Sequence, residues 1–471
     1  MAGIFMSDGD AADIAARLDR LPRSWVIWKM IILASTGGVF EFYDLFLTGY
    51  IAPDMARSGI FSHANIGIFA TLQGIAVSGV GTFVFCTFAG MWVGLVIFSQ
   101  FADWFGRRTV FTWSLLWYVG CTAIMAFQPT GQAMNIWRFI AGIGFSVQLV
   151  TIDAYISEMI PKGERGRAFA ANQFITFCVV PVTALLAWLF SARQIAGFDG
   201  WRWVILIGST GAFAVWALRA GLPESPRWLA LHGMMGEANA VMDDIERRVI
   251  AETRQALPAP ERVMPEKAGT GHFYEIFAPR YFERTVMLSI FNMAQVIGFY
   301  GFAAWVPTLL VARGIALPNS LEYSFIIAIA NPLGPVLGMF IADRVERKFQ
   351  ILFGLTMMGV FMALFSISKS PDILVVFGVL FSICATVMSY AYHSYQTELY
   401  PTRIRARAAG FVYAWSRIAA AFAGLAIGYF LHAGGVPAVA VFISIAVIVG
   451  MVMISVFGPR TSARALEEIN H

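Results

Sequence analysis

Long apolar blocks separated by short polar segments fill most of the chain. About twelve apolar runs of roughly 20 residues, each long enough to cross a bilayer as a helix, are centred near residues 40, 85, 118, 148, 178, 212, 298, 332, 360, 384, 417 and 447. The runs are continuous, whereas the strands of a membrane β-barrel alternate at every second residue. Backbone groups in lipid have no water to bond, so the runs must be helical. The pattern predicts an all-α membrane protein with twelve transmembrane helices in two six-helix bundles.

A polar stretch in the middle of the chain predicts the domain organisation, because six runs precede it and six follow it. We expect an N-terminal bundle over 1–222, a linker with short helices over 223–283, a C-terminal bundle over 284–458 and a tail over 459–471. The linker contains one polar helical stretch near 237–255 and is too short for a second soluble domain. DIAARLDRLP, before the first run, predicts a short surface helix.

The composition excludes a water-soluble fold. Hydrophobic residues make up 58% of the chain, charged residues only 13%, and the mean hydropathy is +0.68, more apolar surface than a soluble core can hide. The four cysteines are scattered through apolar runs without metal or redox spacing, which favours plain packing. The sequence has no phosphate-binding G-x-x-x-x-G-K-[ST] loop and no metal-ligand spacing. We therefore expect no enzyme activity, no nucleic-acid partner, no metal and no cofactor.

The distribution of Lys and Arg predicts the orientation in the membrane. If both termini are cytoplasmic, the cytoplasmic segments hold 26 of the 33 Lys and Arg residues, and only five lie on the other side. This bias sets topology. No cleavable signal segment is evident in the first 23 residues. The expected location is a plasma membrane, the inner membrane of a bacterium, and the expected state is a monomer.

One charged signature occurs twice, 240 residues apart. SQFADWFGRR is matched by MFIADRVERK, and DAYISEMIPKGERGR is matched by a segment that keeps Tyr395, Glu398 and Pro401. Internal repeats of this kind build two membrane bundles around a central path, with the substrate site at mid-depth. The repeat therefore predicts transport by alternating access.

These motifs resemble a known group. The paired D-x-x-G-R-R signature, R-F-I-A-G-I-G-F with Y-I-S-E-M-I-P-x-x-x-R-G-R, and PESPRWL resemble the major facilitator superfamily, in its sugar-porter and organic-ion branches. RLDRLP followed by FEFYDLFLTGYIAP is similar to bacterial metabolite:proton symporters related to nicotinate and aromatic-acid carriers. The chain departs from the pattern at Asp153, where the family usually has Pro. Its counterpart in the repeat is His393, and a gate, a proton exit step and a headgroup position all remain open for Asp153.

Charges at the ends of the repeated loops form the candidate gate. The resemblance implies a latch between the bundles, which is physically reasonable because such exposed pairs are individually weak and therefore reversible. The alternative is a solvated edge that satisfies the positive-inside bias. The candidate gating residues are Asp103, Arg107, Arg108, Glu158, Arg165, Arg167, Asp343, Arg347, Glu398, Arg405 and Arg407.

Four charges lie inside apolar runs, namely Glu41, Asp44, Arg138 and Arg417, where each costs about 2.5–3.5 kcal/mol at a helix centre on insertion scales. Asp44 lies about eight residues, and Arg138 about six, from the outer end of its run, so at about 1.5 Å per residue their depths match. The resemblance to sugar:proton symporters implies that Asp44 carries the proton and that Arg138 is its partner. A permanent structural salt bridge is the alternative. Glu41, one turn deeper, is a second candidate carrier or a relay carboxylate.

Arg417 is the main indication of the substrate. It lies 17 residues after Tyr400, a spacing that resembles organic anion transporters, in which an arginine at that place engages the substrate carboxylate. A guanidinium matches a carboxylate with two parallel hydrogen bonds. An ion pair with an acidic residue of the other bundle, such as Glu41, is the alternative. The other candidate substrate-binding residues are aromatic or polar: Tyr300, Asn292, Gln295, Gln173, His393, Tyr392 and Tyr413.

Together these features predict a proton-coupled symporter of a small organic, aromatic carboxylate. A sugar:proton symporter and an organic-cation or drug transporter that uses Glu41 and Asp44 as the counter-charge are alternatives. A non-transporting membrane receptor on the same fold is a further one.

Overall fold

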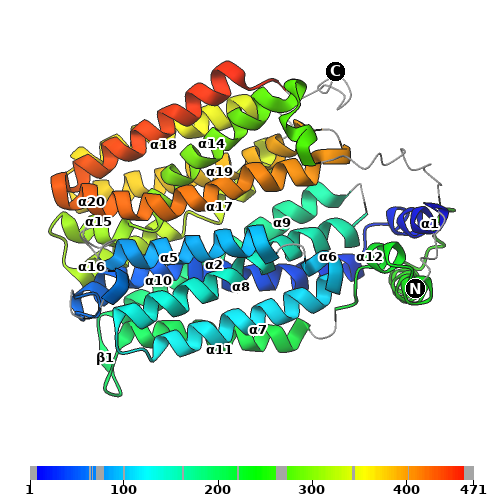
Figure 1. The fold of residues 1–471 in the computed structure, drawn as a ribbon, viewed down its shortest axis with the longest axis horizontal. Coiled ribbons are helices and arrows are strands. Elements are labelled where there is room, and N and C mark those ends of the chain that lie inside the picture. The colour runs from blue at the N-terminus through cyan, green and yellow to red at the C-terminus, as the bar shows by residue number, and fades with distance from the viewer. Residues whose placement is uncertain are drawn as a thin grey trace.

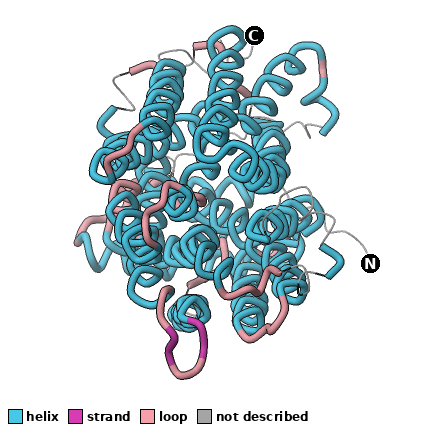
Figure 2. Tube along the Cα trace, turned by 90° about the vertical axis from the view of Figure 1, so that its left-hand side faces the viewer, coloured by secondary structure: helices cyan, strands magenta, loops and turns pink. Residues whose placement is uncertain are grey.

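The computed structural model describes residues 8–62, 65, 67–69, 79–98, 101–161, 164–219, 222–260, 273–341, 345–400 and 402–460. Long helices run roughly along one axis of the molecule, and the N-terminal half lies beside the C-terminal half (Figure 1). Most of the described backbone in the second view is helical, with loops between the helices and one small hairpin (Figure 2).

The N-terminal half contains the first six predicted spans. Its elements are α2 (Trp25–Arg57), the 3₁₀ turn η1 (Gly67–Phe69), α5 (Gly79–Val93) with its π-helical extension η2 (Gly94–Phe98), α6 (Phe101–Phe105), α7 (Arg107–Ala126), α8 (Gly131–Met159), α9 (Arg165–Phe177), α10 (Val179–Leu186) with the π-helical turn η4 (Ala187–Ser191), and α11 (Gly200–Arg219). The hairpin between η4 and α11 pairs β1 (Gln194–Ile195) with β2 (Phe198–Asp199) in antiparallel register.

The C-terminal half repeats this plan. Its elements are the 3₁₀ turn η5 (Phe273–Phe277), α14 (Pro279–Ala303), α15 (Val306–Ala312), α16 (Leu317–Ala328), α17 (Leu333–Ile341), α18 (Arg347–Ile367), α19 (Pro371–Glu398) and α20 (Thr402–Phe457). Three shorter helices lie at one end of the molecule: α1 (Asp8–Asp19), α12 (Pro226–Leu231) and α13 (Met235–Thr253). We call this end the α12 end and the opposite one, where the hairpin lies (Figure 1), the β1 end.

Ten helical stretches in the described part of the chain are long and apolar enough to span a membrane. Helix α11, with 20 residues, is not among these ten, although it coincides with the predicted run near residue 212. Helix α20 has 56 residues and leaves helical geometry at Gly435 (φ 67°, ψ −159°), two residues before Pro437, so it accounts for two spans. The predicted span near residue 332 is interrupted between α16 and α17. The predicted all-α membrane fold is confirmed, whereas the domain boundaries stay predictions.

Short polar residues start several helices where the sequence changes from loop to apolar run. Ser24 accepts a hydrogen bond from the N–H of Ile27 at the start of α2, and Thr130 accepts one from Ala133 at the start of α8. Ser225 does the same for Trp228, with Pro226 in the first helical position of α12. A side-chain oxygen there satisfies one of the free N–H groups of the first turn.

The internal repeat is visible in matched contacts. Arg107 forms an ion pair with Glu158, 2.8 Å apart, and Arg347 forms the corresponding pair with Glu398. Tyr155 donates a hydrogen bond to the carbonyl oxygen of Pro223 (3.0 Å). Its counterpart, Tyr395, donates one to that of Pro459 (2.8 Å). The 240-residue offset read from the sequence therefore relates positions in space as well.

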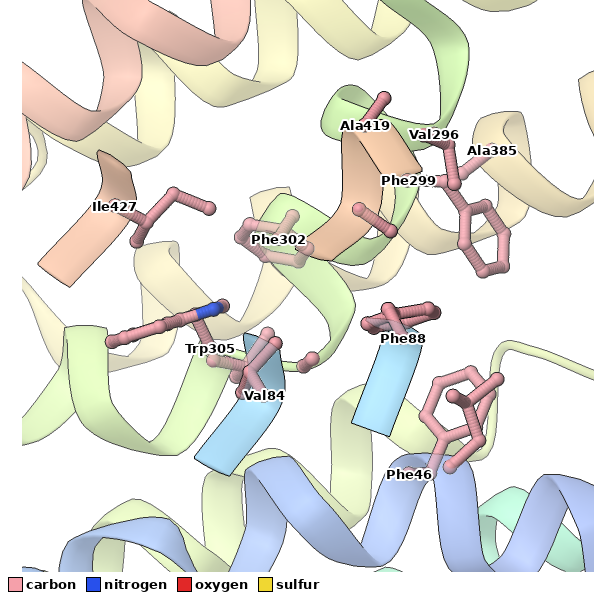
Figure 3. Close-up of a cluster of buried hydrophobic side chains, with 14 of the residues drawn as sticks. Phe46, Val84, Phe88, Val296, Phe299, Phe302, Trp305, Ala385, Ala419 and Ile427 are labelled. Carbon is pink, nitrogen blue, oxygen red and sulfur yellow. The ribbon is translucent and has the colours of Figure 1, made fainter. Parts of the chain in front are cut away.

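The two halves are in close contact on the β1 side of the molecule. A methyl group added at Gly49 of α2 would lie 2.0 Å from the carbonyl oxygen of Ala304, and one added at Gly424 of α20 would lie 2.6 Å from a methyl carbon of Val84. Figure 3 shows aromatic and aliphatic side chains of α2 and α5 facing those of the C-terminal half across this contact. Glycine is required here because the backbones approach too closely for any side chain.

The α12 end carries a second apolar core. Ile14 and Leu18 of α1 are buried against α12, α13 and the adjoining ends of the spans. Arg17 donates hydrogen bonds to Asn239 (2.8 Å), Asp243 and Glu246 of α13. The predicted surface helix exists, but its apolar face covers protein.

The linker helix also caps the first span. Both carboxylate oxygens of Glu252, on α13, accept backbone N–H groups at the start of α2, from Trp25 (2.6 Å) and Val26 (2.9 Å). A negative charge at this end of a helix is favourable. The predicted linker helix is therefore present, and it is attached to the N-terminal half.

Candidate transport site

Asp44 of α2 and Arg138 of α8 form a buried ion pair in the N-terminal half. Nη1 of Arg138 lies 2.5 Å from Oδ2 of Asp44, and the two residues are 1% and 2% exposed. The depths counted in the sequence therefore bring the pair together. Each charge of a pair that is buried away from water depends on its partner and on further hydrogen bonds. Removing one partner would leave an uncompensated buried charge.

The guanidinium of Arg138 uses each of its three nitrogens. Besides Asp44, Nη2 donates to Thr48 (2.5 Å) and Nε to Thr87 of α5 (2.9 Å), while the ring of Phe83 lies 5.1 Å from the guanidinium carbon. Sequence reasoning missed both threonines. Thr48 could have been found as the residue one turn after Asp44, but nothing in the sequence marks the depth of Thr87.

Glu41 is also buried, one turn from Asp44 on the same helix. It does not neutralise Arg417, because no described acidic residue forms an ion pair with that arginine. The alternative in which Arg417 pairs with Glu41 is therefore not seen in this structure. Whether Asp44 or Glu41 carries a proton stays a prediction.

Arg417 of α20 lies within the C-terminal half, 3% exposed. Its Nη2 donates a hydrogen bond to the hydroxyl of Tyr413 (2.8 Å), and its guanidinium carbon is 4.7 Å from the centre of that ring. Nη1 is buried and has no hydrogen-bond partner among the described residues. A buried donor of this kind costs free energy unless a ligand or water satisfies it.

Aromatic side chains surround this arginine. His393 and Tyr413 have ring centres 5.8 Å apart, and the hydroxyl of Tyr392 is 3.2 Å from Nε2 of His393. Nδ1 of His393 is 2.7 Å from the carbonyl oxygen of Ser389, which holds the ring in place. Arg417, Tyr413, Tyr392 and His393 thus form one connected group, here called the Arg417 group.

Tyr300 connects the two halves. Its ring centre lies 5.3 Å from that of Phe88 and 6.5 Å from that of Phe46, both in the N-terminal half, and it interacts electrostatically with Arg417. Aromatic rings at these separations attract one another. Relative movement of the two halves would therefore change the contacts that Tyr300 makes with the Arg417 group.

The predicted amide residues are less closely connected. Asn292 donates to the carbonyl oxygen of Leu288 (2.9 Å), and Gln295 is buried near Tyr392, with which it interacts. Gln173, on α9, has a buried Oε1 without a partner in the described structure, and no described contact joins it to the Arg417 group.

The candidate gating charges pair within each half. Arg107–Glu158 joins α7 to α8, and Arg347–Glu398 joins α18 to α19. Arg167 pairs with Glu164, its neighbour in the same helical turn. None of the ion pairs given for the described residues joins the two bundles, so the latch between them stays a prediction.

The remaining gating residues are less completely described. The side chains of Arg108 and Arg407 are exposed. Asp343 lies outside the described residues. The side chains of Asp103, Arg165 and Arg405 also lie outside the described part of the structure.

A carboxylate at the N-terminus of α7 is held by backbone groups. Glu224 accepts N–H groups from Arg107 (3.0 Å) and Arg108 (3.0 Å). Burial raises the pKa of Glu224, although these N–H groups oppose the shift. No group of three or more described His, Cys, Asp or Glu side chains is arranged to hold a metal ion.

Comparison with known proteins places this architecture. Residues 30–471 match the family model described as "Sugar (and other) transporter". The chain belongs to this family. It is thus a multi-pass membrane protein of the major facilitator superfamily, as its motifs predicted, and its relatives are transporters.

Two relatives in this family cover almost the whole chain. The niacin transporter NiaP of Acinetobacter baylyi is 25% identical over 461 residues, which cover 97% of this chain and 99% of the relative. The inner membrane metabolite transport protein YdjE of Escherichia coli is 27% identical over 468 residues, covering 97% and 98%.

A solved structure has the same fold. The xylose transporter XylE of E. coli, in a partially occluded inward-open conformation, superposes with a TM-score of 0.74 at 19% identity. The match covers 94% of this chain and all of that one.

Proposed function

We propose that this family member is a proton-coupled symporter that moves a small aromatic carboxylate by alternating access. The observation that carries the proposal is the buried Nη1 of Arg417, which has no described partner although the residue lies inside a membrane-spanning helix. A charge in that position is usually retained for function. A carboxylate would complete the hydrogen bonding of the guanidinium.

The Arg417 group suits a flat ring. Tyr300, Tyr392, Tyr413 and His393 offer ring faces and edges close to the arginine, and stacking on such rings favours an aromatic body. The name of the relative NiaP, a niacin transporter, supports the same class of cargo.

Coupling to protons is assigned to the Asp44–Arg138 pair. Arg138 stabilises the charged form of Asp44 when the pair is closed, and separation or dehydration would favour the protonated form. Movement between conformations that open and close the pair would then bind and release a proton. The α12 end is assigned to the cytoplasm of a bacterial cell, because the excess of Lys and Arg lies there.

Uptake into proteoliposomes tests the proposal. With an inward proton gradient, labelled aromatic acids should accumulate, and Arg417→Gln should abolish their binding in a thermal-shift assay. Arg417→Lys is the matched control: it keeps the charge but loses the two-point geometry, so we expect weakened rather than absent binding. Equal binding of the acids by wild type and Arg417→Gln would refute the carboxylate site.

A proton-coupled sugar symporter is the second candidate. It is favoured by the description of the family model and by the XylE structure. Asn292 and Gln295, both buried on α14, are residue types that bind sugar hydroxyls. Accumulation of a labelled sugar that carboxylates do not compete for would favour this candidate.

A further inference from the structure

Asp153 is an exposed carboxylate near the C-terminal end of α8 (Gly131–Met159), on a stretch of that helix whose other described side chains are buried or half-buried. From Trp137 to Met159, it is the only exposed side chain among those that the structure describes on α8. Helices α2, α5, α7 and α9 all pack against α8, so this helix lies inside the N-terminal half. Neither the ion pair at Asp44 nor the pairs at the α12 end use Asp153.

The helical phase shows which way Asp153 points. It follows Ser146 by seven residues and Gly142 by eleven, so all three lie on one face of α8. A methyl group at Gly142 would lie 2.6 Å from the carbonyl oxygen of Thr87 on α5, and one at Gly94 would lie 2.2 Å from Oγ of Ser146. The face that bears Asp153 is therefore directed toward the second span, which packs against α20, the helix that carries Arg417.

The repeat gives an independent indication. The offset of 240 residues that relates the Arg107 and Arg347 ion pairs also relates Asp153 to His393 and Gln173 to Tyr413. His393 and Tyr413 belong to the Arg417 group. By the same symmetry, Asp153 and Gln173 occupy the corresponding place in the N-terminal half, and Oε1 of Gln173 is buried without a described partner.

Among the described residues, Arg417 in one half has no acidic partner and Asp153 in the other half has no basic one. Because the guanidinium of Arg417 is buried, an opposite charge beside it lowers the cost of removing it from water. A simple anion would satisfy Arg417 but would repel Asp153.

We propose that Asp153, with Gln173, is a second subsite that binds a positively charged or N–H-bearing group of the substrate. The transported molecule is then amphoteric: a carboxylate that meets Arg417 and an ammonium or protonated ring nitrogen that meets Asp153. This inference rests on the proposed carboxylate site and narrows its substrate class.

Matched pairs of acids test it on the purified full-length protein at pH 7. Each pair differs by one group, as 4-(aminomethyl)benzoate differs from 4-methylbenzoate, and aliphatic pairs are included. Wild type should bind the amine-bearing acid at least tenfold more tightly. Asp153→Asn should remove this preference and leave the plain acid unchanged or tighter, while Asp153→Glu should retain part of it. Arg417→Gln should weaken both acids.

The outcomes separate the two proposals. Equal binding of both members of a pair by wild type, or equal loss of both in Asp153→Asn, would overturn the subsite and leave the carboxylate site standing. Binding of a plain acid that loses its pH dependence in Asp153→Asn would make Asp153 a proton carrier instead and would also overturn it. Failure of every acid to bind wild type would overturn the carboxylate site itself, and the subsite with it.

Discussion

Replacing Arg138 by Met should destabilise the protein far more than removing an ordinary surface charge. The substitution keeps an unbranched apolar stem but removes the guanidinium, so Asp44, 2% exposed, loses its ion-pair partner. Breaking a buried pair in this way costs about 3–5 kcal/mol. The hydroxyls of Thr48 and Thr87 lose their donor as well, at about 1 kcal/mol each.

A double-mutant cycle isolates the charge. Asp44→Asn combined with Arg138→Met removes both charges, so the double variant should be about 2 kcal/mol more stable than the sum of the two single losses predicts. Denaturant unfolding of the purified protein in detergent, followed by tryptophan fluorescence, measures each free energy. Arg248→Met is the control, because its ion pair with Asp244 is exposed and should contribute less than 1 kcal/mol. Simple additivity would refute the reasoning.

Two further perturbations address the halves and the α12 end. Gly49→Ala should force the β1 side apart and lengthen distances between spin labels placed across it, whereas Gly120→Ala, which meets no atom within 4 Å, should change nothing. Acidification should release α1. Burial alone would raise the pKa of Glu246, but hydrogen bonds from Arg17 and Arg20 lower it overall. The ionised Glu246 therefore stabilises the folded protein at any pH above its ordinary pKa of about 4.3. This contribution is lost as the pH falls through the lower pKa that Glu246 has in the folded protein. Protection factors in α1, which correct for the slow intrinsic exchange in acid, that stay high at pH 3 would contradict this.

The spans were predictable because the bilayer imposes a length and a composition on each of them. The same constraint fixed depth, so counting residues from the ends of two runs was enough to bring Asp44 and Arg138 together. The depth of a residue in the membrane does not indicate which way its helix is rotated or which uncharged residues of other helices lie beside it. For that reason Thr87 was missed, although its hydroxyl accepts a hydrogen bond from Nε of the same guanidinium.

The N-terminal helix shows where apolar periodicity becomes ambiguous. Ile14 and Leu18 mark an amphipathic face, and such a face suits a membrane surface as well as a protein surface. Only the acidic residues of α13, more than 200 positions away, decide between them by holding Arg17. The gating charges present the same problem, because a latch between bundles and a pair within each bundle use identical residues. The choice depends on conformation, which the sequence does not specify.

The two buried arginines show how the protein treats the same cost in different ways. Arg138 is fully satisfied by its own half of the molecule, through a carboxylate, a carbonyl and two hydroxyls. Arg417 donates to the hydroxyls of Tyr413 and Tyr300 and keeps a buried Nη1 without a described partner. Transfer of a guanidinium from water into the membrane interior costs a similar free energy at both positions. Arg417, which keeps a donor without a described partner, is therefore expected to gain more from a bound ligand than Arg138. We therefore expect substitutions at Arg417 to cost more in substrate affinity than in folding, and those at Arg138 to cost more in folding than in affinity.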